Sequence, residues 1–436
     1  MSTVLVAAAV LILVLIIGAP IPLAFFASTL TIVLMGGYDF HFLFPYGYNK
    51  ASSIILCAIP LFVLAGSFME KGGIGESLVD FVGSFVGRIK GGLGIVMVVS
   101  CALFGAISGS GFATLSCIGS IMLPRMYAAG YPKGHCSALI SSASVLALLI
   151  PPSLNMILYA WVGGTSILAS FAATVIPGII LVTLFSTINV FLLRDCETIA
   201  VMPKIPRSER PPEQRILRST FRAIPAILAP LIILGGIYGG IMTPTEAAAV
   251  SVVYSIPVGF FIYKGLNRKT LKSSLVEAGT TTGVILIMLF SVMVMSRLYT
   301  MENVPSKILA VLTSISENQF VLLMMINLFL VIIGMLMDDT SAILLCTPIL
   351  LPVVTELGIS PTHFAAIIGV NLGLGCVTPP TAPFLYLGSR IGGAPVNEML
   401  RTTTYLIFFG WIPTLLVTTY VPGLSLWLPR LLGLAV

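Results

Sequence analysis

Long apolar stretches separated by short polar ones run through the whole chain. Fourteen apolar segments can be distinguished, seven before and seven after a polar stretch at 195–222. In the first half they lie near residues 4–19, 22–37, 53–68, 93–107, 112–124, 136–163 and 167–193, and in the second half near 223–240, 245–263, 276–296, 320–337, 341–354, 363–389 and 402–428. Many approach or exceed the ~20 residues that span a hydrocarbon core as a helix. The pattern predicts an all-α polytopic membrane protein.

The composition agrees with this class. Hydrophobic residues make up 57% of the 436 residues, charged residues make up 9%, and the mean hydropathy is +1.08, whereas a soluble domain carries roughly a quarter charged residues. Long apolar runs with little alternation argue against a porin-like barrel. The net charge of +6 is interpreted as the cytoplasmic excess of Lys and Arg that orients membrane helices, so no nucleic-acid partner is expected. The seven cysteines show no Cys-x-x-Cys spacing and are interpreted as small buried apolar residues.

The two halves of the sequence repeat one another. Sliding the second half over the first by 228 residues pairs Pro124 with Pro352 and Gly130 with Gly358. The same offset pairs His135 with His363, Pro151-Pro152 with Pro379-Pro380, and Ser110-Gly111 with Asp338-Asp339. We therefore predict a first repeat over residues 1–195, a cytoplasmic linker at 196–222 and a second repeat over 223–436.

Basic residues indicate the orientation. Lys and Arg crowd the linker, so we place it in the cytoplasm. Suppose that the segments at 93–124 and 320–354 dip into the membrane and return to the same side. All but four of the 22 Lys and Arg then lie on the cytoplasmic side of the membrane. Each half then crosses the membrane an odd number of times, so the repeats are inverted, each with a re-entrant helical hairpin and a broken helix. Inverted repeats are typical of secondary transporters.

Four polar interruptions occur at corresponding places in the two halves. Two are tips of the predicted hairpins, at 108–114 and 338–341, and two are breaks in long helices, at 150–155 and 375–381. Each break holds a Pro-Pro pair, which cannot donate to the helix ladder and leaves preceding carbonyls unpaired. Irregular backbone at membrane depth is tolerated only where it is buried in protein or lines a cavity. The second tip carries two adjacent carboxylates, which are costly at that depth and indicate a functional site.

The chemistry of these interruptions suits an alkali cation. Freed carbonyls, hydroxyls and a carboxylate form an oxygen cage for such an ion, and half-helix N-termini offer amides to an anion. The pairing predicts one cation site in each half. The first comprises Ser108, Ser110 and the carbonyls before Pro151 and Pro152. The second comprises Asp338, Thr340 and the carbonyls around Gly375 and Thr378.

Each interruption also has a purely structural interpretation. A Pro-Pro pair kinks a helix, and Ser-Gly-Ser-Gly provides a small-residue helix contact. Asp338 and Asp339 could form an extramembrane turn between two spanning helices, because the eighteen residues before them reach about 27 Å as a helix. Two close buried acids also allow one to stay protonated, which leaves proton coupling open. Recurrence at matched positions favours the functional interpretation.

Three other features are interpreted as structural. The segment Thr243 to Glu246, with Pro at the first helical position, fits a capping box. His135 and His363 begin corresponding long helices and are predicted to lie at the membrane interface. The aromatic segment 38–48 fits an interfacial belt outside the membrane.

Several motifs together resemble the large, DctM-like membrane subunit of the tripartite ATP-independent periplasmic (TRAP) transporters. They are GAISGSGFAT from Gly105, IMLPRMYAAGYPK from Ile121, LIPPS from Leu149, GGIMTPTEAAAV from Gly239, and the pair GMLMDDTSAILLCTPILLPV and VTPPTAPFLY. The resemblance implies sodium-driven uptake across a bacterial or archaeal inner membrane by an elevator mechanism. A transport domain of hairpins and broken helices, approximately 93–165 plus 320–391, is expected to move against a scaffold formed by the remainder.

The resemblance also implies partners. We expect a separate small membrane subunit of the DctQ-like type with about four helices, and a periplasmic binding protein that delivers a small organic anion. The sequence presents no obvious intramembrane Arg as a carboxylate clamp, so backbone amides and hydroxyls must do more of the anion binding. A carboxylate and a sulfonate therefore both remain open as substrates.

The family's site residues carry over by position. Na⁺ is the expected coupling ion, at two or more sites. The first sodium site maps onto Ser108, Ser110, Ile150 and Pro152. The second maps onto Asp338, Thr340, Gly375, Thr378 and Pro380. The substrate candidates between the tips are Gly109, Gly111, Asn155, Asp339 and Thr381. Which of the two acids ligates the ion is not fixed by the sequence.

Two rival functions remain. A stand-alone sodium- or proton-coupled organic-anion symporter or antiporter shares inverted repeats and hairpins but needs no binding protein. An intramembrane hydrolase would use Ser108 or Ser110 as nucleophile with His135 as base, although the sequence gives no sign of the rigid geometry that activates a nucleophile. We expect a transporter and no enzyme.

Overall fold

The computed structural model describes residues 2–86, 89–194 and 212–434, and these residues form helices without any strand. Eight of the described helices are long and apolar enough to cross a membrane, and several shorter apolar helices accompany them. The predicted all-α membrane fold is therefore confirmed.

The described residues of the first half form ten α-helices, with short 3₁₀ turns at 54–57 and 145–148. They are α1 (Ser2–Ile16), α2 (Ile21–Gly36), α3 (Leu43–Ala51), α4 (Ala58–Lys71), α5 (Ile74–Val86), α6 (Gly92–Ser108), α7 (Gly111–Ala128), α8 (Lys133–Ser144), α9 (Leu154–Gly163) and α10 (Ile167–Leu192). The helices α6 and α7 meet at the first predicted hairpin tip, and the chain breaks between α8 and α9 at the first Pro-Pro pair.

The second half has a similar series among its described residues. It comprises α11 (Pro212–Tyr238), α12 (Pro244–Pro257), α13 (Arg268–Met301), α14 (Val304–Ile315), α15 (Gln319–Leu336), α16 (Asp339–Glu356), α17 (Pro361–Val377), α18 (Pro383–Gly392), α19 (Val396–Leu406), α20 (Ile412–Tyr420) and α21 (Pro422–Leu431). Residues 258–262 and 407–411 are single π-helical turns. The described part of α11 begins at Pro212, inside the predicted linker, and residues 195–211 lie outside the described part of the chain.

Helix boundaries in the two halves follow the offset found in the sequence. The helices α7 and α16 both contain 18 residues, and they begin at 111 and 339, which are 228 positions apart. The helices α6 and α15 end at 108 and 336. These boundaries share the predicted offset, and the repeat and its inverted topology stay predictions.

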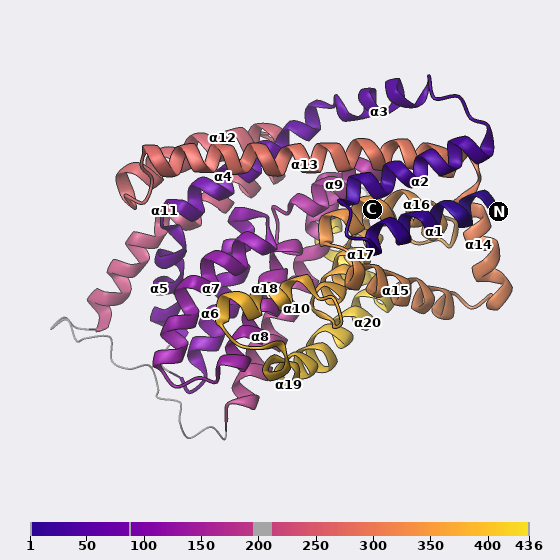
Figure 1. The fold of residues 1–436 in the computed structure, drawn as a ribbon. Coiled ribbons are helices and arrows are strands. Elements are labelled where there is room, and N and C mark those ends of the chain that lie inside the picture. The colour runs from indigo at the N-terminus through magenta and orange to yellow at the C-terminus, as the bar shows by residue number, and fades with distance from the viewer. Residues whose placement is uncertain (1, 87–88, 195–211, 435–436) are drawn as a thin grey trace.

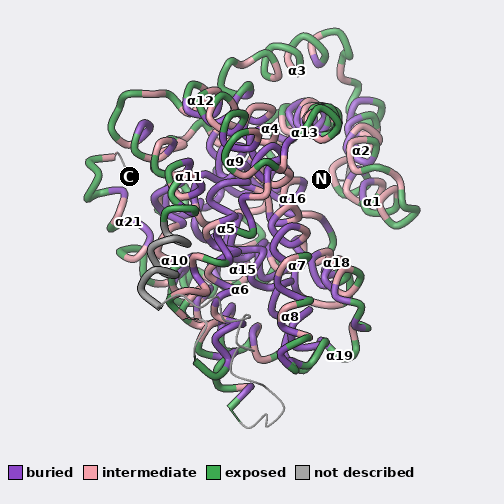
Figure 2. Tube along the Cα trace, turned by 90° about the vertical axis from the view of Figure 1, so that its left-hand side faces the viewer, coloured by how far each residue is buried: buried purple, intermediate pink, exposed green. Residues whose placement is uncertain are grey.

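The helices are arranged in layers around the broken ones. In Figure 1, α3, α12 and α13 lie along the upper edge and α8, α19 and α20 along the lower edge, with α6, α7 and α15 between them. Every residue from Gly134 to Ser144 in α8 and from Thr362 to Val377 in α17 is buried. Figure 2 shows buried residues concentrated in the interior and exposed residues along α3. A helix that is buried all round belongs to the core of the protein, so the core contains both broken helices.

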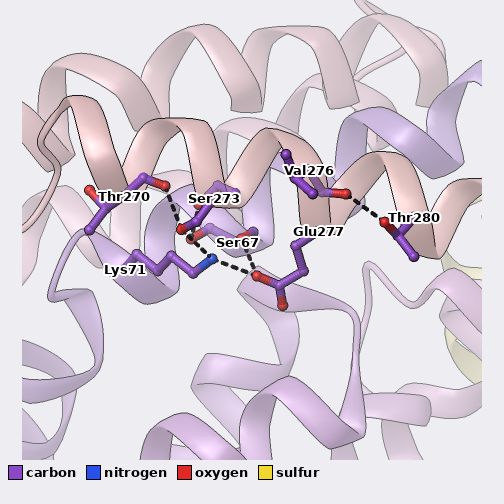
Figure 3. Close-up of polar contacts among 8 residues, drawn as sticks. Ser67, Lys71, Thr270, Ser273, Val276, Glu277 and Thr280 are labelled. Atoms are coloured by element: carbon purple, nitrogen blue, oxygen red, sulfur yellow. Dashed lines mark hydrogen bonds and ion pairs between the residues drawn. The ribbon is translucent and has the colours of Figure 1, made fainter.

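Polar contacts join α4 to α13 (Figure 3). Lys71 Nζ lies 2.6 Å from Glu277 Oε2 and donates to Ser273 Oγ at 3.1 Å, and Ser67 Oγ donates to Glu277 at 3.4 Å. A partly exposed ion pair contributes little to stability on its own, but three polar contacts along one seam fix the register of the two helices. The helix α4 is therefore attached to α13 on one side, while its Gly66 faces the first hairpin.

Two structural predictions have different outcomes. The capping box is confirmed, because Thr243 Oγ1 accepts from Glu246 N and the Glu246 carboxylate accepts from Thr243 N. The predicted interfacial position of the histidines stays a prediction. His135 and His363 are 6% and 1% exposed, and each is hydrogen-bonded inside the helix bundle. Their burial is inside the protein and does not set their depth in a membrane.

Most of the described cysteines are buried, as the sequence predicted. The exception is Cys57, which is exposed, and Cys196 lies outside the described residues.

Candidate functional site: the hairpin tips and helix breaks

The first hairpin tip is a compact arrangement of hydroxyls and backbone. Ser108 ends α6, Gly109 turns the chain with φ of 62°, and Ser110 caps α7 by accepting from Ala113 N at 3.4 Å. Thr114 Oγ1 donates to the Ser110 carbonyl at 2.8 Å and lies 3.2 Å from Ser108 Oγ. Three hydroxyl side chains thus gather around the end of α6, where the helix dipole is negative.

This tip touches the first helix break. Leu154 N donates to the Gly109 carbonyl at 3.4 Å. A Cβ on Gly109 would lie 3.2 Å from the Pro152 carbonyl oxygen, so the close approach requires glycine in addition to the positive φ. Ser153 Oγ is buried here without a hydrogen-bond partner among the described residues. The predicted residues of the first cation site therefore come from two segments that lie against each other.

The second hairpin tip presents one half-buried and one buried carboxylate. Asp338 caps α16, accepting from Ser341 N at 3.2 Å and from the Ser341 hydroxyl. Asp339 is 5% exposed. A buried carboxylate is stable only when it is hydrogen-bonded, paired with a cation or protonated, so the surroundings of Asp339 decide what this tip can do.

Asn155 connects the second tip to the first broken helix. Its Nδ2 donates to Asp339 Oδ2 at 2.7 Å, and its Oδ1 accepts from Thr340 Oγ1 at 3.1 Å. Asn155 is 4% exposed and lies in the first turn of α9. The two halves of the chain are thus joined at their polar interruptions by a single amide side chain.

The helix that leads to the second tip, α15, packs against the second break. A Cβ on Gly375 in α17 would lie 2.6 Å from the backbone of Gly334 in α15, so these helices approach each other through glycine. Thr378 caps α17, and its hydroxyl donates back to the Leu374 carbonyl at 2.6 Å. The C-terminal ends of α15 and α17 therefore meet near the tip, and both dipoles favour a cation there.

The first tip contacts α18, the helix that follows the second break, through aromatic rings. Phe112 and Phe384 stack with ring centroids 4.3 Å apart, and a Cβ on Gly111 would lie 2.6 Å from the Phe384 ring. The first break thus contacts both tips, while the second break and the helix after it pack against α15 and the first tip. We call the four polar interruptions, residues 108–114, 150–155, 338–341 and 375–381, the tip cluster.

Three predicted site residues have few contacts with the hairpin tips. Pro380 and Thr381 are exposed, and the Pro380 carbonyl accepts from the Tyr386 hydroxyl at 3.0 Å. The described contacts do not bring these two residues to the second tip. Ile150 is half-buried beside the buried proline pair. Its carbonyl role at the first site stays a prediction.

Two residues of the tips were missed by the sequence reasoning. Thr114 joins the hydroxyl group at the first tip, and Ser341 binds Asp338 at the second. Both lie in the first helical turn after the N-capping residue, at positions i+4 and i+3. That spacing brings a side chain back to the cap and could have identified them.

The arrangement does not support the hydrolase alternative. His135 Nε2 lies 3.0 Å from Asn189 Oδ1, and His135 Nδ1 lies 3.2 Å from Thr402 Oγ1. Both ring nitrogens are therefore engaged by α10 and α19. The proposed pairing of this histidine with Ser108 or Ser110 is not formed.

Other features of the described residues lie apart from the tip cluster. No group of three or more His, Cys, Asp or Glu side chains there is arranged to hold a metal ion, which leaves hydroxyl and carbonyl cages as the candidates. An apolar cavity of about 200 Å³ lies between α2, α3 and α13, and a larger groove lies between α6 and α10. Neither is lined by a residue of the tip cluster.

Comparisons with known proteins agree on one family. The family model described as "Tripartite ATP-independent periplasmic transporter, DctM component" matches residues 6–424. The C4-dicarboxylate TRAP transporter large permease protein DctM of Pseudomonas aeruginosa is 35% identical over 392 residues, with 89% of each chain covered. The isethionate TRAP transporter permease protein DctMQ of Oleidesulfovibrio alaskensis is 32% identical over 422 residues, covering 94% of this chain and 64% of that protein.

A solved structure supports the fold alone. The crystal structure of the Alcanivorax borkumensis YdaH transporter superposes with a TM-score of 0.60 at 16% identity, with 88% of each chain covered. The likeness shows that the helical architecture is one that a membrane transporter uses.

Proposed function

This chain belongs to the DctM family and is the large inner-membrane permease subunit of a TRAP transporter, and we propose that it moves a small organic anion inward together with sodium ions. The observation that carries the proposal is the tip cluster. It joins hydroxyls, carbonyls, carboxylates and helix ends from both halves of the chain at one place.

The first proposed cation site lies at the first tip and break. The C-terminal end of α6 provides the negative end of a dipole, and Ser108, Ser110 and Thr114 provide hydroxyl oxygens. The Ile150 and Pro152 carbonyls complete the proposed cage. Such a set of neutral oxygens suits an alkali cation better than a transition metal, which favours imidazole or thiolate ligands.

The second proposed cation site lies at the second tip. Asp338 and Thr340 provide side-chain oxygens, and the ends of α15 and α17 provide backbone carbonyls around Gly375 and Thr378. Asp339, held by Asn155, lies next to this site. A bound cation would compensate the buried negative charge, which links sodium occupancy to the arrangement of the tip.

The anion is proposed to bind between the two tips. The four segments of the tip cluster contain no Lys or Arg, so the positive charge for an anion must come from bound sodium, backbone amides and the N-terminal ends of α7, α9, α16 and α18. This requirement couples the two ligands, because the anion binds best after the cations have arrived. Gly109, Gly111 and Asn155 are the substrate contacts that the geometry favours.

The substrate is proposed to be a carboxylate or a sulfonate of small size. One relative is named for C4-dicarboxylates and another for isethionate. We further propose that a separate small membrane subunit and a periplasmic binding protein complete the transporter. The name DctMQ and the 64% of that relative covered here fit a large and a small subunit fused in one chain.

We propose that the hairpins and broken helices slide past α4 along the surface where α4 contacts the first hairpin. A Cβ on Gly66 of α4 would lie 3.1 Å from the backbone of Ser108, so two backbones face each other without an intervening side chain. Because α4 is tied to α13 by Lys71 and Glu277, it suits the fixed side of an elevator. The hairpins and broken helices form the moving side.

Reconstitution tests this proposal. The chain and its small subunit are placed in proteoliposomes, and labelled succinate and isethionate are offered with the binding protein. We expect accumulation only with an inward sodium gradient, the binding protein and the matching anion. Accumulation driven by a proton gradient without sodium would refute sodium coupling. Equal accumulation without the binding protein would favour the stand-alone symporter.

A further inference from the structure

A groove between α6 and α10 lies apart from the tip cluster. Its volume is about 420 Å³, and its lining residues are Ile95, Ser186, Thr187, Val190, Phe191 and Arg194. Three of them are large and apolar, two carry hydroxyls, and one carries a permanent positive charge. A groove of this composition matches an amphiphile with an anionic head.

A second cation lies at the mouth of the groove. Lys90 Nζ donates to the carbonyl of Arg194 at 2.7 Å, so the ammonium group is held where α10 ends. Both side chains belong to exposed residues. The contact places the Lys90 ammonium beside the backbone of Arg194, a residue that lines the groove, so two basic residues lie at the end of α10 and both attract an anion to this end.

The wall of the groove contains an unpaired hydroxyl. Thr183 and Thr187 donate to backbone carbonyls one turn earlier in α10, at 2.9 and 2.8 Å. Ser186 Oγ is buried but has no hydrogen-bond partner among the described residues. A buried polar group without a partner is costly, so the polar atoms of this wall differ: the Thr183 and Thr187 hydroxyls are satisfied within α10, and the Ser186 hydroxyl is enclosed beneath the surface of the groove.

The groove also lies at a membrane surface. The helix α10 is a 26-residue candidate span, so its last turn reaches one edge of the bilayer. The excess of Lys and Arg on the linker side predicts that this edge faces the cytoplasm. Basic pockets between membrane helices on that side bind the head groups of anionic lipids.

We propose that the groove is a binding site for an anionic phospholipid of the cytoplasmic leaflet. Arg194 and Lys90 hold the phosphate, and an acyl chain lies along Val190 and Phe191. We expect the site to prefer anionic over zwitterionic phospholipids. A zwitterionic head group would place its own cation next to the cations of Lys90 and Arg194.

Native mass spectrometry of the detergent-solubilised complex with its small subunit tests the site. Phosphatidylglycerol and phosphatidylcholine are titrated separately, and we expect preferential retention of phosphatidylglycerol. The double variant Lys90→Gln/Arg194→Gln should lose about tenfold or more of that preference, because each basic group near an anionic lipid contributes about 1 kcal/mol. The matched control is Arg268→Gln/Lys269→Gln, two exposed basic residues at the start of α13.

The outcomes separate a built site from general lipid contact. Equal retention of both lipids, or an equal loss in the two double variants, would overturn the proposal. Thr187→Leu fills the groove from an exposed lining residue without touching the charges, and we expect it to reduce the amount of retained phosphatidylglycerol while the unfolding temperature is unchanged. Retention at the original level in that variant would also contradict the groove as the site.

Discussion

The side-chain amide of Asn155 donates to Oδ2 of Asp339 at 2.7 Å, across 184 positions of sequence. The same amide accepts from Thr340. The first broken helix therefore holds the second hairpin tip in place, and a change at Asn155 is transmitted to both predicted members of that tip.

Substituting Asn155 should weaken the coupling to sodium. In Asn155→Ala the Asp339 carboxylate loses a donor, and a hydrogen bond to a charged group contributes about 1.5–3 kcal/mol. We expect the apparent sodium affinity of uptake to fall by about tenfold or more. The measurement is uptake against sodium concentration in proteoliposomes. Asn318→Ala, which removes the cap of α15 outside the tip cluster, is the control, and an unchanged sodium curve in Asn155→Ala would disprove the role.

The second tip is tested by Asp338→Asn and Thr340→Val. If Asp338 is a ligand, removing its charge should cost about 2 kcal/mol or more of cation binding, or about thirtyfold in sodium affinity. Thr340→Val should have a smaller effect in the same direction. Asp339→Asn, measured in parallel, shows which of the two carboxylates ligates the sodium ion. If all three variants keep the native sodium dependence, the second cation site does not exist.

The first tip is tested by Ser110→Ala. Ser110 also caps α7, and loss of a cap costs about 1 kcal/mol of stability. Ser166→Ala is a matched control, because Ser166 caps α10 through the same type of bond, to Ala169 N at 3.3 Å. We expect similar losses of thermal stability in both variants without sodium, but a lower sodium affinity only in Ser110→Ala. Equal sodium responses would remove Ser110 from the proposed cage.

The close approach of α4 to the first hairpin is tested by Gly66→Ala. The added methyl would lie 3.1 Å from the Ser108 backbone, and overpacking of this kind costs typically about 1–3 kcal/mol. We expect slower uptake with little change in assembly with the small subunit. Gly283→Ala on α13 meets nothing within 4 Å and should transport normally. A native uptake rate in Gly66→Ala would mean that this surface does not limit movement.

Local signals in the sequence located the parts of the site. Each Pro-Pro pair lacks backbone N–H groups and therefore interrupts a long helix. Ser110 and Asp338 cap the starts of helices because their side chains accept from backbone amides in the next turn. The capping box at Thr243 was predicted from the same kind of local pattern. These features depend on residues within about one helical turn, so the sequence contains the information needed to predict them.

Contacts between segments that are distant in the sequence could not be predicted in the same way. The sequence grouped Asn155 and Asp339 as substrate candidates but did not predict the hydrogen bond between them, and it did not identify Asn189 and Thr402 as the partners of His135. Apolar helices can pack against many others, and a pattern of apolar residues does not name the neighbour.

The sequence by itself determined the membrane class and the four polar interruptions, because each follows from hydrophobic length or from backbone chemistry over a few residues. Only the tertiary structure decided how the tips, the breaks and the helices next to them pair, through Gly109 and Leu154, Asn155 and Asp339, Gly334 and Gly375, and Phe112 and Phe384. Those pairings are selected by the shapes of whole helices packed together, and that selection involves both halves of the chain at once.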